Sequence, residues 1–375
     1  MSISAARRPL ALYVLFGLTG VGLVLPGTLL PFLARRWGWQ DGRSGLLFFL
    51  FFVGTTVGAF CARGMLGRML LLAGFAVAAP LAWLPILHGP TIFAAVVLNG
   101  FGLGLTMTAV TLLRSRQVRG ERVTELARLN LLWALGAACA PFLLLRSAAS
   151  VGLTATLRSY AAVILLCAMA AALPLWSEDV PTEGTWAAWR RVRALPALFA
   201  ISLPLATGIE AGVGAWLVTY ASRDGAAHHA VITAGSALWA GLLLSRLLFS
   251  GRRFRLPQSR FTGAAFAGLL VCGLLLLFSG NAAPAIVAGA FCAGFGIGPV
   301  YPQLLALLLS SSEAGNAGFL LAGAGSALLP LLIGQVSQHT HSLRLGLLVP
   351  LLASVVLLLS LLYAAQIAGK RSRLG

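Results

Sequence analysis

Acidic residues are scarce in this chain, since only 9 of its 375 residues are Asp or Glu. Charged residues of both signs make up 10% of the chain, whereas about 25% is usual for soluble domains. In contrast, 59% of the residues are hydrophobic and the mean hydropathy is +0.92. A chain with so little charge cannot keep most of its surface in water, so the composition excludes an ordinary soluble protein and predicts an integral membrane protein.

Cysteine and histidine are also few, with five residues of each. The cysteines lie within or at the ends of hydrophobic runs and include no CxxC pair, so we expect neither a disulfide framework nor a metal centre. The histidines lie outside the runs, so the spans contain no set of residues that could act as nucleophile and base or bind a metal. This argues against an intramembrane enzyme or a bound cofactor. The chain also lacks a Walker-type loop, which disfavours ATP-driven transport.

Hydrophobic runs, in contrast, recur along the whole chain, and each is long enough to cross about 30 Å of hydrocarbon as an α-helix. The first run has a basic flank like a signal peptide but is too long and lacks a convincing cleavage site, so we interpret it as a retained helix. The sequence therefore predicts an all-α membrane protein with 12 transmembrane helices. The runs are 9–34, 44–62, 69–87, 91–113, 126–145, 157–176, 195–220, 230–249, 261–279, 283–310, 318–336 and 345–368.

Basic residues are distributed unevenly between the loops on the two sides of these runs. With the N-terminus placed in the cytoplasm, 20 of the 27 Lys and Arg residues lie on that side and 7 on the other. Because basic residues are retained on the cytoplasmic side, we expect a protein of the plasma (inner) membrane with both termini cytoplasmic. The net charge of +18 is then a topology signal, and with no basic stripe interleaved with aromatics we expect no nucleic-acid partner.

Short motifs repeat between the two halves of the chain. Gly-Phe-Gly-Leu-Gly at 100–104 returns as Gly-Phe-Gly-Ile-Gly at 294–298, six runs later, and Thr19-Gly20 returns as Thr207-Gly208. A weaker echo pairs Gly58, five residues before Arg63, with Gly241, five residues before Arg246. We interpret the glycines at 100–104 and 294–298 as kinks that let the fourth and tenth helices bend. Tight packing of helices alone would also explain these glycines.

These repeats predict a duplication of six helices. We expect an N-terminal half at 1–176, a cytoplasmic central loop at 177–193 and a C-terminal half at 194–375. Six spans return the chain to its starting side, so both halves have the same orientation. Parallel halves of this kind are a transporter architecture, with the substrate near the midplane between them.

Twelve runs in two halves, a short central loop and arginines in the 2–3 and 8–9 loops resemble the major facilitator superfamily. The segments 207–220 and 298–302 are similar to the branch that contains fucose:proton symporters and related sugar permeases. The resemblance implies secondary transport of a small molecule by alternating access. The chain differs from the family's 2–3 loop motif, because Ala62 stands where an acidic residue is usual, and it has no carboxylate in the first or fourth run, unlike fucose symporters.

Glu210 is the one acidic residue that lies inside a hydrophobic run, a few residues past the middle of 195–220. An ionisable group in a membrane span costs about 2.5 to 3.5 kcal/mol on insertion scales, so it needs a functional or structural reason. Desolvation favours the neutral acid, and we predict that Glu210 is a proton-coupling group. The alternative is a structural Glu that caps backbone in a glycine-rich helix, since the sequence offers no cationic partner at comparable depth.

Uncharged polar and aromatic residues at similar depth are candidates for substrate binding. A cavity lined by amides, hydroxyls and indoles suits a neutral hydroxylated solute such as a sugar. The alternative is that Asn and Thr bond neighbouring helices while Trp and Tyr anchor at interfaces. The candidates are Asn99, Thr106, Thr108, Asn130, Trp133, Trp216, Trp239, Tyr301 and Gln303.

Arg63 and Arg246 are candidates for gating, because they fall at the predicted inner ends of the second and eighth helices. A guanidinium there can bond carbonyls at a helix C-terminus, although retention of topology explains these arginines equally well. Taken together, the sequence predicts a proton-coupled secondary transporter that acts as a monomer in the lipid bilayer. The alternatives are a proton-driven exporter of amphiphilic compounds and a non-transporting receptor or assembly factor of the same fold.

Overall fold

The computed structural model describes residues 4–62, 64–117, 122–176, 179–180, 195–224, 226–250, 260–279, 282–311 and 315–374. Nearly all of these residues are helical, and among them 12 helices are long and apolar enough to cross a membrane. The predicted fold class and number of spans are therefore confirmed. Several of the spans extend further than the sequence predicted; for example, the second begins at Asp41 and the fifth at Glu125.

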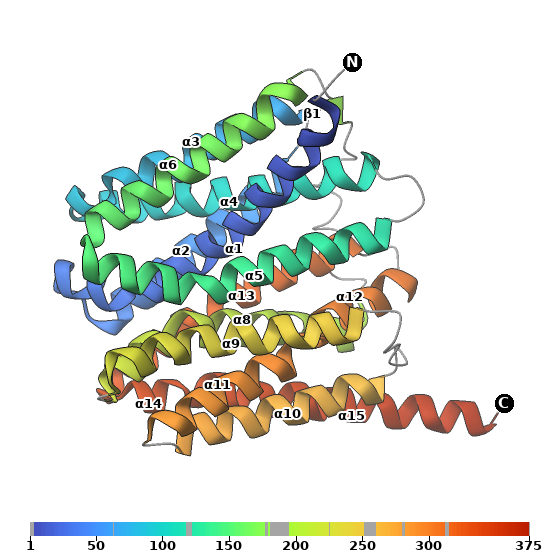
Figure 1. Cartoon of the computed structure of the whole chain (residues 1–375). Coiled ribbons are helices and arrows are strands. Elements are labelled where there is room, and N and C mark those ends of the chain that lie inside the picture. The colour runs from blue at the N-terminus through green and yellow to red at the C-terminus, as the bar shows by residue number, and fades with distance from the viewer. Residues whose placement is uncertain are drawn as a thin grey trace. The chain divides into compact units, whose positions relative to one another are not determined.

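The described elements follow one another along the chain almost entirely as helices (Figure 1). Two-residue strands β1 (Gly64–Met65) and β2 (Asp179–Val180) pair in antiparallel fashion. The helices up to residue 176 are α1 (Ser4–Trp37), α2 (Asp41–Phe60), α3 (Leu66–Trp83), α4 (Pro90–Gln117), α5 (Arg122–Ser150) and α6 (Leu153–Ala172), with single 3-10 turns at Leu84–Ile86 and Leu173–Leu175. The later helices are α8 (Ala197–Arg223), α9 (His228–Ser250), α10 (Arg260–Ser279), α11 (Ala283–Ile297), α12 (Val300–Ser311), α13 (Gly315–Thr340), α14 (Leu343–Gly346) and α15 (Leu348–Leu374).

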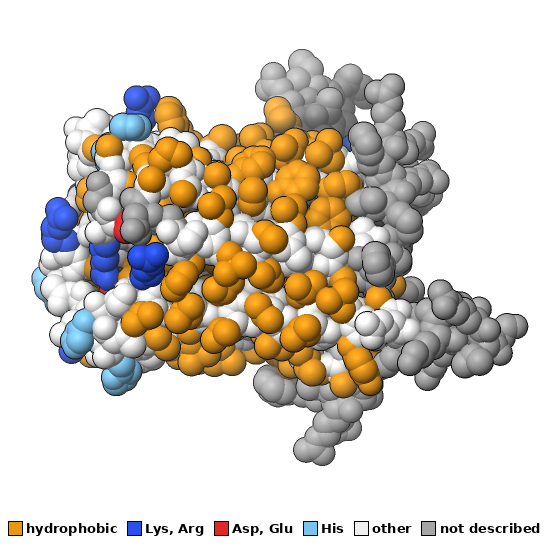
Figure 2. All heavy atoms as spheres, turned by 90° about the horizontal axis from the view of Figure 1, so that it is seen from below, with side chains coloured by type: hydrophobic (Ala, Val, Ile, Leu, Met, Phe, Trp, Pro, Cys, Tyr) orange, Lys and Arg blue, Asp and Glu red, His pale blue; other side chains and the backbone are white. Residues whose placement is uncertain are grey.

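Large apolar side chains face outward on many of these helices. Leu72, Leu166 and Leu352 are each about 60% exposed. Figure 2 shows hydrophobic side chains spread over the face that it displays, while Arg and His side chains gather toward one end. In lipid such a surface needs no cover, because the hydrocarbon tails are as apolar as the side chains.

By its internal contacts the chain divides into two compact units. The first unit is Met1–Gly38 with Leu47–Gly184, and the second is Trp39–Leu46 with Thr185–Gly375. The segment Trp39–Leu46, which contains the start of α2, groups with the second unit. Most of the predicted central loop at 177–193 lies outside the described residues.

In the first unit, glycines allow α2 and α4 to pack with their backbones in contact. A Cβ added at Gly54 would overlap the carbonyl oxygen of Val97, and one at Gly100 would overlap that of Phe51. Such close approach requires glycine, because any side chain would push the helices apart.

The second unit repeats this contact between α9 and α11. A Cβ at Gly241 would overlap the carbonyl oxygen of Phe291, which is 194 residues after Val97, the residue that faces Gly54. The structural equivalent of Gly241 is therefore Gly54. The expected pairing of Gly241 with Gly58 is wrong by one helical turn. It was based on one Gly and one Arg, and two residues are too few to choose between glycines on neighbouring turns of α2.

The two glycine segments behave differently. Helix α4 runs unbroken from Pro90 to Gln117, whereas its repeat partner is interrupted between α11 and α12, at Gly298 and Pro299. The tenth span therefore has the expected kink, whereas the helix of the fourth span is not broken. The difference follows from Pro299 and Pro302, which have no counterparts in the fourth span and cannot donate backbone hydrogen bonds.

Candidate functional site

Glu210 is the middle residue of α8, with thirteen helical residues on each side. Two residues away in either direction, Gly208 and Gly212 contact α13, since a Cβ at either position would come within 2.8 Å of Gly325 or Ile333. Two residues correspond to about 200° around an α-helix. The Glu210 side chain therefore leaves α8 on the face opposite to α13.

On that face Glu210 meets Arg246 of α9. The Nη2 atom of Arg246 lies 3.6 Å from Oε2 of Glu210, and the side chains are 13% and 16% exposed. The expectation that Glu210 has no cationic partner at its depth is wrong. That expectation failed because the sequence aligned Arg246 with Arg63. In the structure Arg246 is equivalent to Ala59 of α2, and it therefore lies one turn further inside its helix.

Arg246 also binds the break in the tenth span, because its Nε donates to the carbonyl oxygen of Gly298 at 3.2 Å. In an uninterrupted helix this carbonyl would accept from the N–H four residues later, which is the position of Pro302. Proline has no N–H, so the oxygen is available to the guanidinium. The approach at Gly298 is close, since a Cβ there would overlap Oγ of Ser245 unless that side chain moved.

Tyr301 on α12 completes a polar cluster with these residues, since it lies close enough to interact electrostatically with both Glu210 and Arg246. The cluster therefore draws on α8, α9 and the broken tenth span. Two predicted site residues, Glu210 and Tyr301, are brought together, and the gating candidate Arg246 joins them.

The carboxylate of Glu210 can bind and release one proton. The free-energy cost of that step depends on the groups around it, above all on the guanidinium of Arg246. Their separation of 3.6 Å is longer than the 2.7–2.9 Å of direct charge-assisted hydrogen bonds. Protonation of Glu210 removes the negative charge that faces a mostly buried guanidinium, and a buried charge that loses its partner costs about 3–5 kcal/mol. Proton binding is therefore coupled to any event that supplies Arg246 with water or another acceptor.

The other aromatic and amide candidates of the second unit pack against neighbouring helices. Trp216 is fully buried and its Nε1 donates to the carbonyl oxygen of Pro330 at 2.9 Å. Trp239 is nearly buried and lies against α8, where a Cβ at Gly214 would meet its ring. The amide oxygen of Gln303 faces Gly263 of α10.

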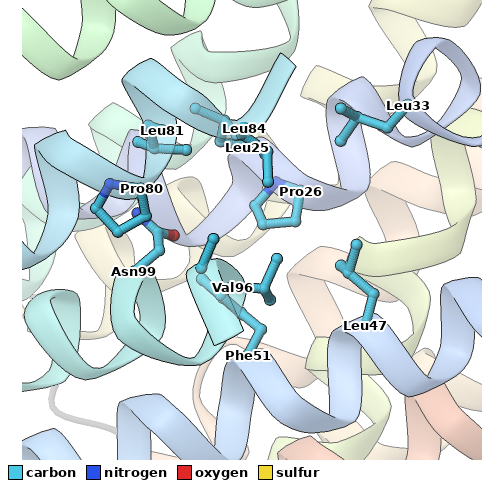
Figure 3. A pocket seen from close by; sticks show the side chains of 11 residues that line it. Leu25, Pro26, Leu33, Leu47, Phe51, Pro80, Leu81, Leu84, Val96 and Asn99 are labelled. Carbon is cyan, nitrogen blue, oxygen red and sulfur yellow. The ribbon is translucent and has the colours of Figure 1, made fainter. Parts of the chain in front are cut away.

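In the first unit, Asn99 is bound to a neighbouring helix. Its Nδ2 donates to the carbonyl oxygen of Val77 in α3 at 3.3 Å. It also lines an otherwise apolar cavity of about 20 Å³, beside Pro80 and Leu81 (Figure 3). A cavity of that size holds about one water molecule, so it cannot hold a solute.

The remaining candidates of the first unit have different degrees of exposure. Thr106 is buried and donates to Gly102 of its own helix at 2.8 Å, whereas the exposed Asn130 donates to Leu126 at 2.9 Å. Trp133 is buried and Thr108 is half-buried. Of Asn99, Thr106 and Asn130, only Asn99 bonds a neighbouring helix, as the structural alternative expects, since Thr106 and Asn130 bond their own helices. A substrate role for all of them stays a prediction.

An open groove of about 770 Å³ lies along α9 and α11. It is lined mainly by alanines and by Thr233, Ser236, Phe291 and Cys292, and includes none of the predicted substrate residues.

The sequence missed a buried carboxylate in the first unit, Glu125, which is 1% exposed. Its Oε1 accepts hydrogen bonds from Nε of Arg114 and from the hydroxyl of Tyr13, both at 2.6 Å. Nη2 of Arg114 in turn donates to the Tyr13 hydroxyl at 2.8 Å. Glu125 stands one residue before the predicted fifth run, so its position at the edge of a charged loop hid it.

The gating prediction has an uneven outcome. Arg63 lies outside the described residues. Arg246 does bond a helix carbonyl, as the prediction supposes, but that carbonyl belongs to the break in the tenth span and the same guanidinium faces Glu210.

Comparisons with known proteins agree on the fold. The model of a family described as Major Facilitator Superfamily matches residues 12–327. Among solved structures, a variant of the E. coli fucose:proton symporter FucP is similar at a TM-score of 0.62 and 15% identity, over 94% of this chain and 97% of that one. FucP in the outward conformation gives a TM-score of 0.63 and 16% identity over the same shares. No curated protein matches the sequence. At these identities the likeness to FucP concerns the fold.

Proposed function

Because the chain belongs to the Major Facilitator Superfamily, a family of transporters and not of enzymes, we propose that it is a secondary transporter driven by protons, with Glu210 as the group that carries the proton. The observation that supports this proposal is the ion pair between Glu210 and Arg246 at the middle of α8. An ionisable residue at this depth in a membrane span is a functional candidate by default, and its partner is now identified.

In the proposed cycle Glu210 takes a proton from one side of the membrane and releases it to the other. The carboxylate accepts the proton while its site is open to the first side, and Arg246 loses its counter-charge. Reopening to the second side lets water reach the site, so that the proton leaves and the pair with Arg246 forms again. No covalent bond other than the O–H bond of Glu210 is made or broken.

We propose a neutral hydroxylated solute, of which sugars are the first to test, as the substrate class. The similarity of fold to a fucose:proton symporter supports this choice, as does Tyr301, which lies within electrostatic range of the ionic pair. An amphiphilic compound would fit the apolar surroundings of the same site. The experiment below separates the two classes.

The deciding experiment is uptake by proteoliposomes after a pH jump, with a panel of neutral sugars and lipophilic drugs. Wild type should accumulate a member of the panel in response to the gradient, and Glu210→Gln should lose this response while retaining exchange or binding. Asp224→Asn is the matched control, because Asp224 is an exposed acid just after the same helix and its removal should leave uptake unchanged.

Equal gradient-driven uptake by wild type and Glu210→Gln would make Glu210 structural and refute its coupling role. Accumulation of drugs and not of sugars would replace the substrate class with amphiphiles. Binding without flux in wild type would identify a receptor of this fold.

We also propose that both termini face the cytoplasm of a plasma (inner) membrane and that the protein acts as a monomer. Four arginines pair with carboxylates and therefore report on packing and not on topology, namely Arg114, Arg128, Arg223 and Arg246. Without these four, 17 basic residues remain on the proposed cytoplasmic side and 6 on the other. The bias that supports this orientation therefore survives the correction.

A further inference from the structure

In the first unit, two arginines bind the C-terminal end of α3, at the end of the unit where α1 also ends and α6 begins. Nε of Arg36, in the last turn of α1, donates to the carbonyl oxygen of Pro85 at 2.9 Å. Nε of Arg158, in the second turn of α6, donates to the carbonyl oxygen of Ala82 at 3.3 Å. Carbonyl groups at a helix C-terminus carry partial negative charge, so they hold both guanidinium groups in place.

The two arginines keep most of their hydrogen-bonding capacity for a ligand. A guanidinium has several N–H donors besides Nε, and within the described part of the chain Arg36 and Arg158 bond only through Nε. Both residues are exposed. Their two acceptors are three residues apart, which is about 4.5–6 Å along a helix axis. Guanidinium groups held at this spacing can share one phosphate, whose oxygens accept forked, charge-assisted hydrogen bonds.

Among the described residues at this end of the first unit, no carboxylate balances these charges. In the sequence the acidic residues of the unit fall at 121–125 and 178–183, where α5 begins and after α6 ends, which is the other end of the helices. Two more exposed cations, Arg35 and Arg146, lie in the last turns of α1 and α5. This end of the unit therefore carries uncompensated positive charge, which attracts anions.

Apolar side chains beside the arginines favour a lipid over a soluble anion. Trp83 and Ile86 lie next to the two acceptor carbonyls, at the end of the third span, and are 60% and 46% exposed. Tryptophan is enriched at the level of the lipid headgroups, because one part of its ring system is apolar and another is polar. A free phosphate would gain nothing from these side chains, whereas a phospholipid also has an apolar part that can contact them.

The second unit has the equivalent helix end. The carbonyl of Ala73 faces the fourth span as that of Phe266 faces the tenth, which relates α3 to α10 by 193 residues. The residue equivalent to Pro85 is therefore Phe278, whose carbonyl oxygen accepts a hydrogen bond from Nε of Arg344 at 2.9 Å. A guanidinium at this carbonyl is thus common to both units.

The charge balance differs between the two equivalent helix ends. The Thr-Gly repeat at 19 and 207 relates α1 to α8 by 188 residues, so the position equivalent to Arg36 is Asp224. Asp224 and Arg344 both lie close enough to Tyr220 to interact electrostatically with it. The second unit therefore sets one arginine near a carboxylate where the first unit has two arginines, and the repeat predicts an anion site in the first unit.

We propose that Arg36 and Arg158 bind the phosphate of an anionic phospholipid in the leaflet around this end of the first unit, with Trp83 against the glycerol region of the lipid. A zwitterionic headgroup carries an ammonium that competes for the same phosphate, so a lipid with a net negative charge should bind more tightly. The inference uses contacts within the first unit, and it needs neither Glu210 nor a transported solute.

The test is a titration of delipidated full-length protein in detergent with phosphatidylglycerol, followed by native mass spectrometry. Wild type should bind this lipid in preference to phosphatidylcholine. Arg36→Gln combined with Arg158→Gln should weaken the binding about thirtyfold, and each single change about fivefold. Arg35→Gln is the matched control, because it removes the same charge from a side chain that points about 100° away on α1, and it should leave the binding nearly unchanged.

Thermal unfolding without added lipid shows whether each variant is folded. If the double glutamine variant does not fold, Arg36→Lys combined with Arg158→Lys keeps the charge without the forked geometry, and it should still weaken binding more than Arg35→Gln does. Arg344→Gln should bind the lipid as wild type does, since the second unit has no such site. Equal binding by Arg35→Gln and by a folded double variant would overturn the proposal. Equally tight binding of inorganic phosphate would also overturn it, because the site would then take a soluble anion.

Discussion

Each unit of this transporter contains a carboxylate paired with an arginine, but the two pairs are built differently. In the first unit Glu125 and Arg114 are in direct contact at 2.6 Å, with Tyr13 bonded to both. In the second, Glu210 and Arg246 are 3.6 Å apart. The first pair lies where α4 ends and α5 begins, whereas Glu210 is at the middle of α8.

The difference indicates which of the two carboxylates can be protonated more easily. A carboxylate that accepts two short hydrogen bonds from fixed donors is stabilised in its ionised form, because protonation would weaken both bonds and remove the charge that faces the guanidinium. A carboxylate at a longer distance from its partner loses less interaction energy when it is protonated. The tight pair is therefore expected to stabilise the fold, and the loose pair to serve transport.

The largest effect should come from breaking the tight pair. Glu125→Gln leaves Arg114 buried without its counter-charge, and we expect a loss of about 3–5 kcal/mol in the free energy of unfolding. Glu210→Gln should cost clearly less, since Gln resembles the protonated Glu that the proposed cycle visits. Thermal unfolding of both variants in the same detergent checks the order, and a greater loss for Glu210→Gln would reverse the assignment of roles.

A smaller effect should follow from removing the third member of the tight cluster. Tyr13→Phe deletes the hydroxyl that bridges Glu125 and Arg114 but keeps the ring and the ion pair, and we expect a loss of about 1–3 kcal/mol. Tyr363→Phe is the matched control, because Tyr363 is 68% exposed on α15 and its change should leave the unfolding temperature where it is. Equal unfolding temperatures for Tyr13→Phe and wild type would show that the hydroxyl adds nothing to the pair.

The smallest effect should come from a change near the Gly298 carbonyl, which binds Arg246 of the loose pair. Pro302→Ala supplies the missing N–H to Gly298, which then competes with Arg246 for the same oxygen, a bond worth about 0.5–1.5 kcal/mol net. We expect a small change in stability and an altered pH dependence of uptake, because Arg246 then interacts more strongly with Glu210. An unaltered pH profile in a variant that still transports would separate the helix break from the proton site.

Sequence reasoning succeeded for features that depend on residues close together in the chain. Hydrophobic runs predicted the spans, and Glu210 was singled out because it interrupts one of them. It failed for Arg246, since placing it required the register between α2 and α9, and a single Gly and Arg do not define that register. Glu125 and Asp41 were overlooked because both stand at the margin of a span, where an acidic residue also suits a loop.

The candidate substrate residues show the same limit. Asn99, Trp216 and Thr106 were chosen by depth, which the sequence provides, whereas the direction of a side chain depends on what surrounds the helix. In the structure Asn99 donates to Val77 and Trp216 to Pro330, so both bond to neighbouring helices. Depth alone cannot separate a residue that lines a path from one that holds two helices together.

The sequence by itself determined the membrane class, the twelve helices and the resemblance to the family, because hydrophobicity adds up residue by residue along a span. Only the tertiary structure decided which charges meet, since Asp41 and Arg223 are 182 residues apart and Glu210 and Arg246 lie on different helices. In a low-dielectric interior the energy of a charge depends on neighbours within a few ångströms. Those neighbours are set by the packing of helix on helix.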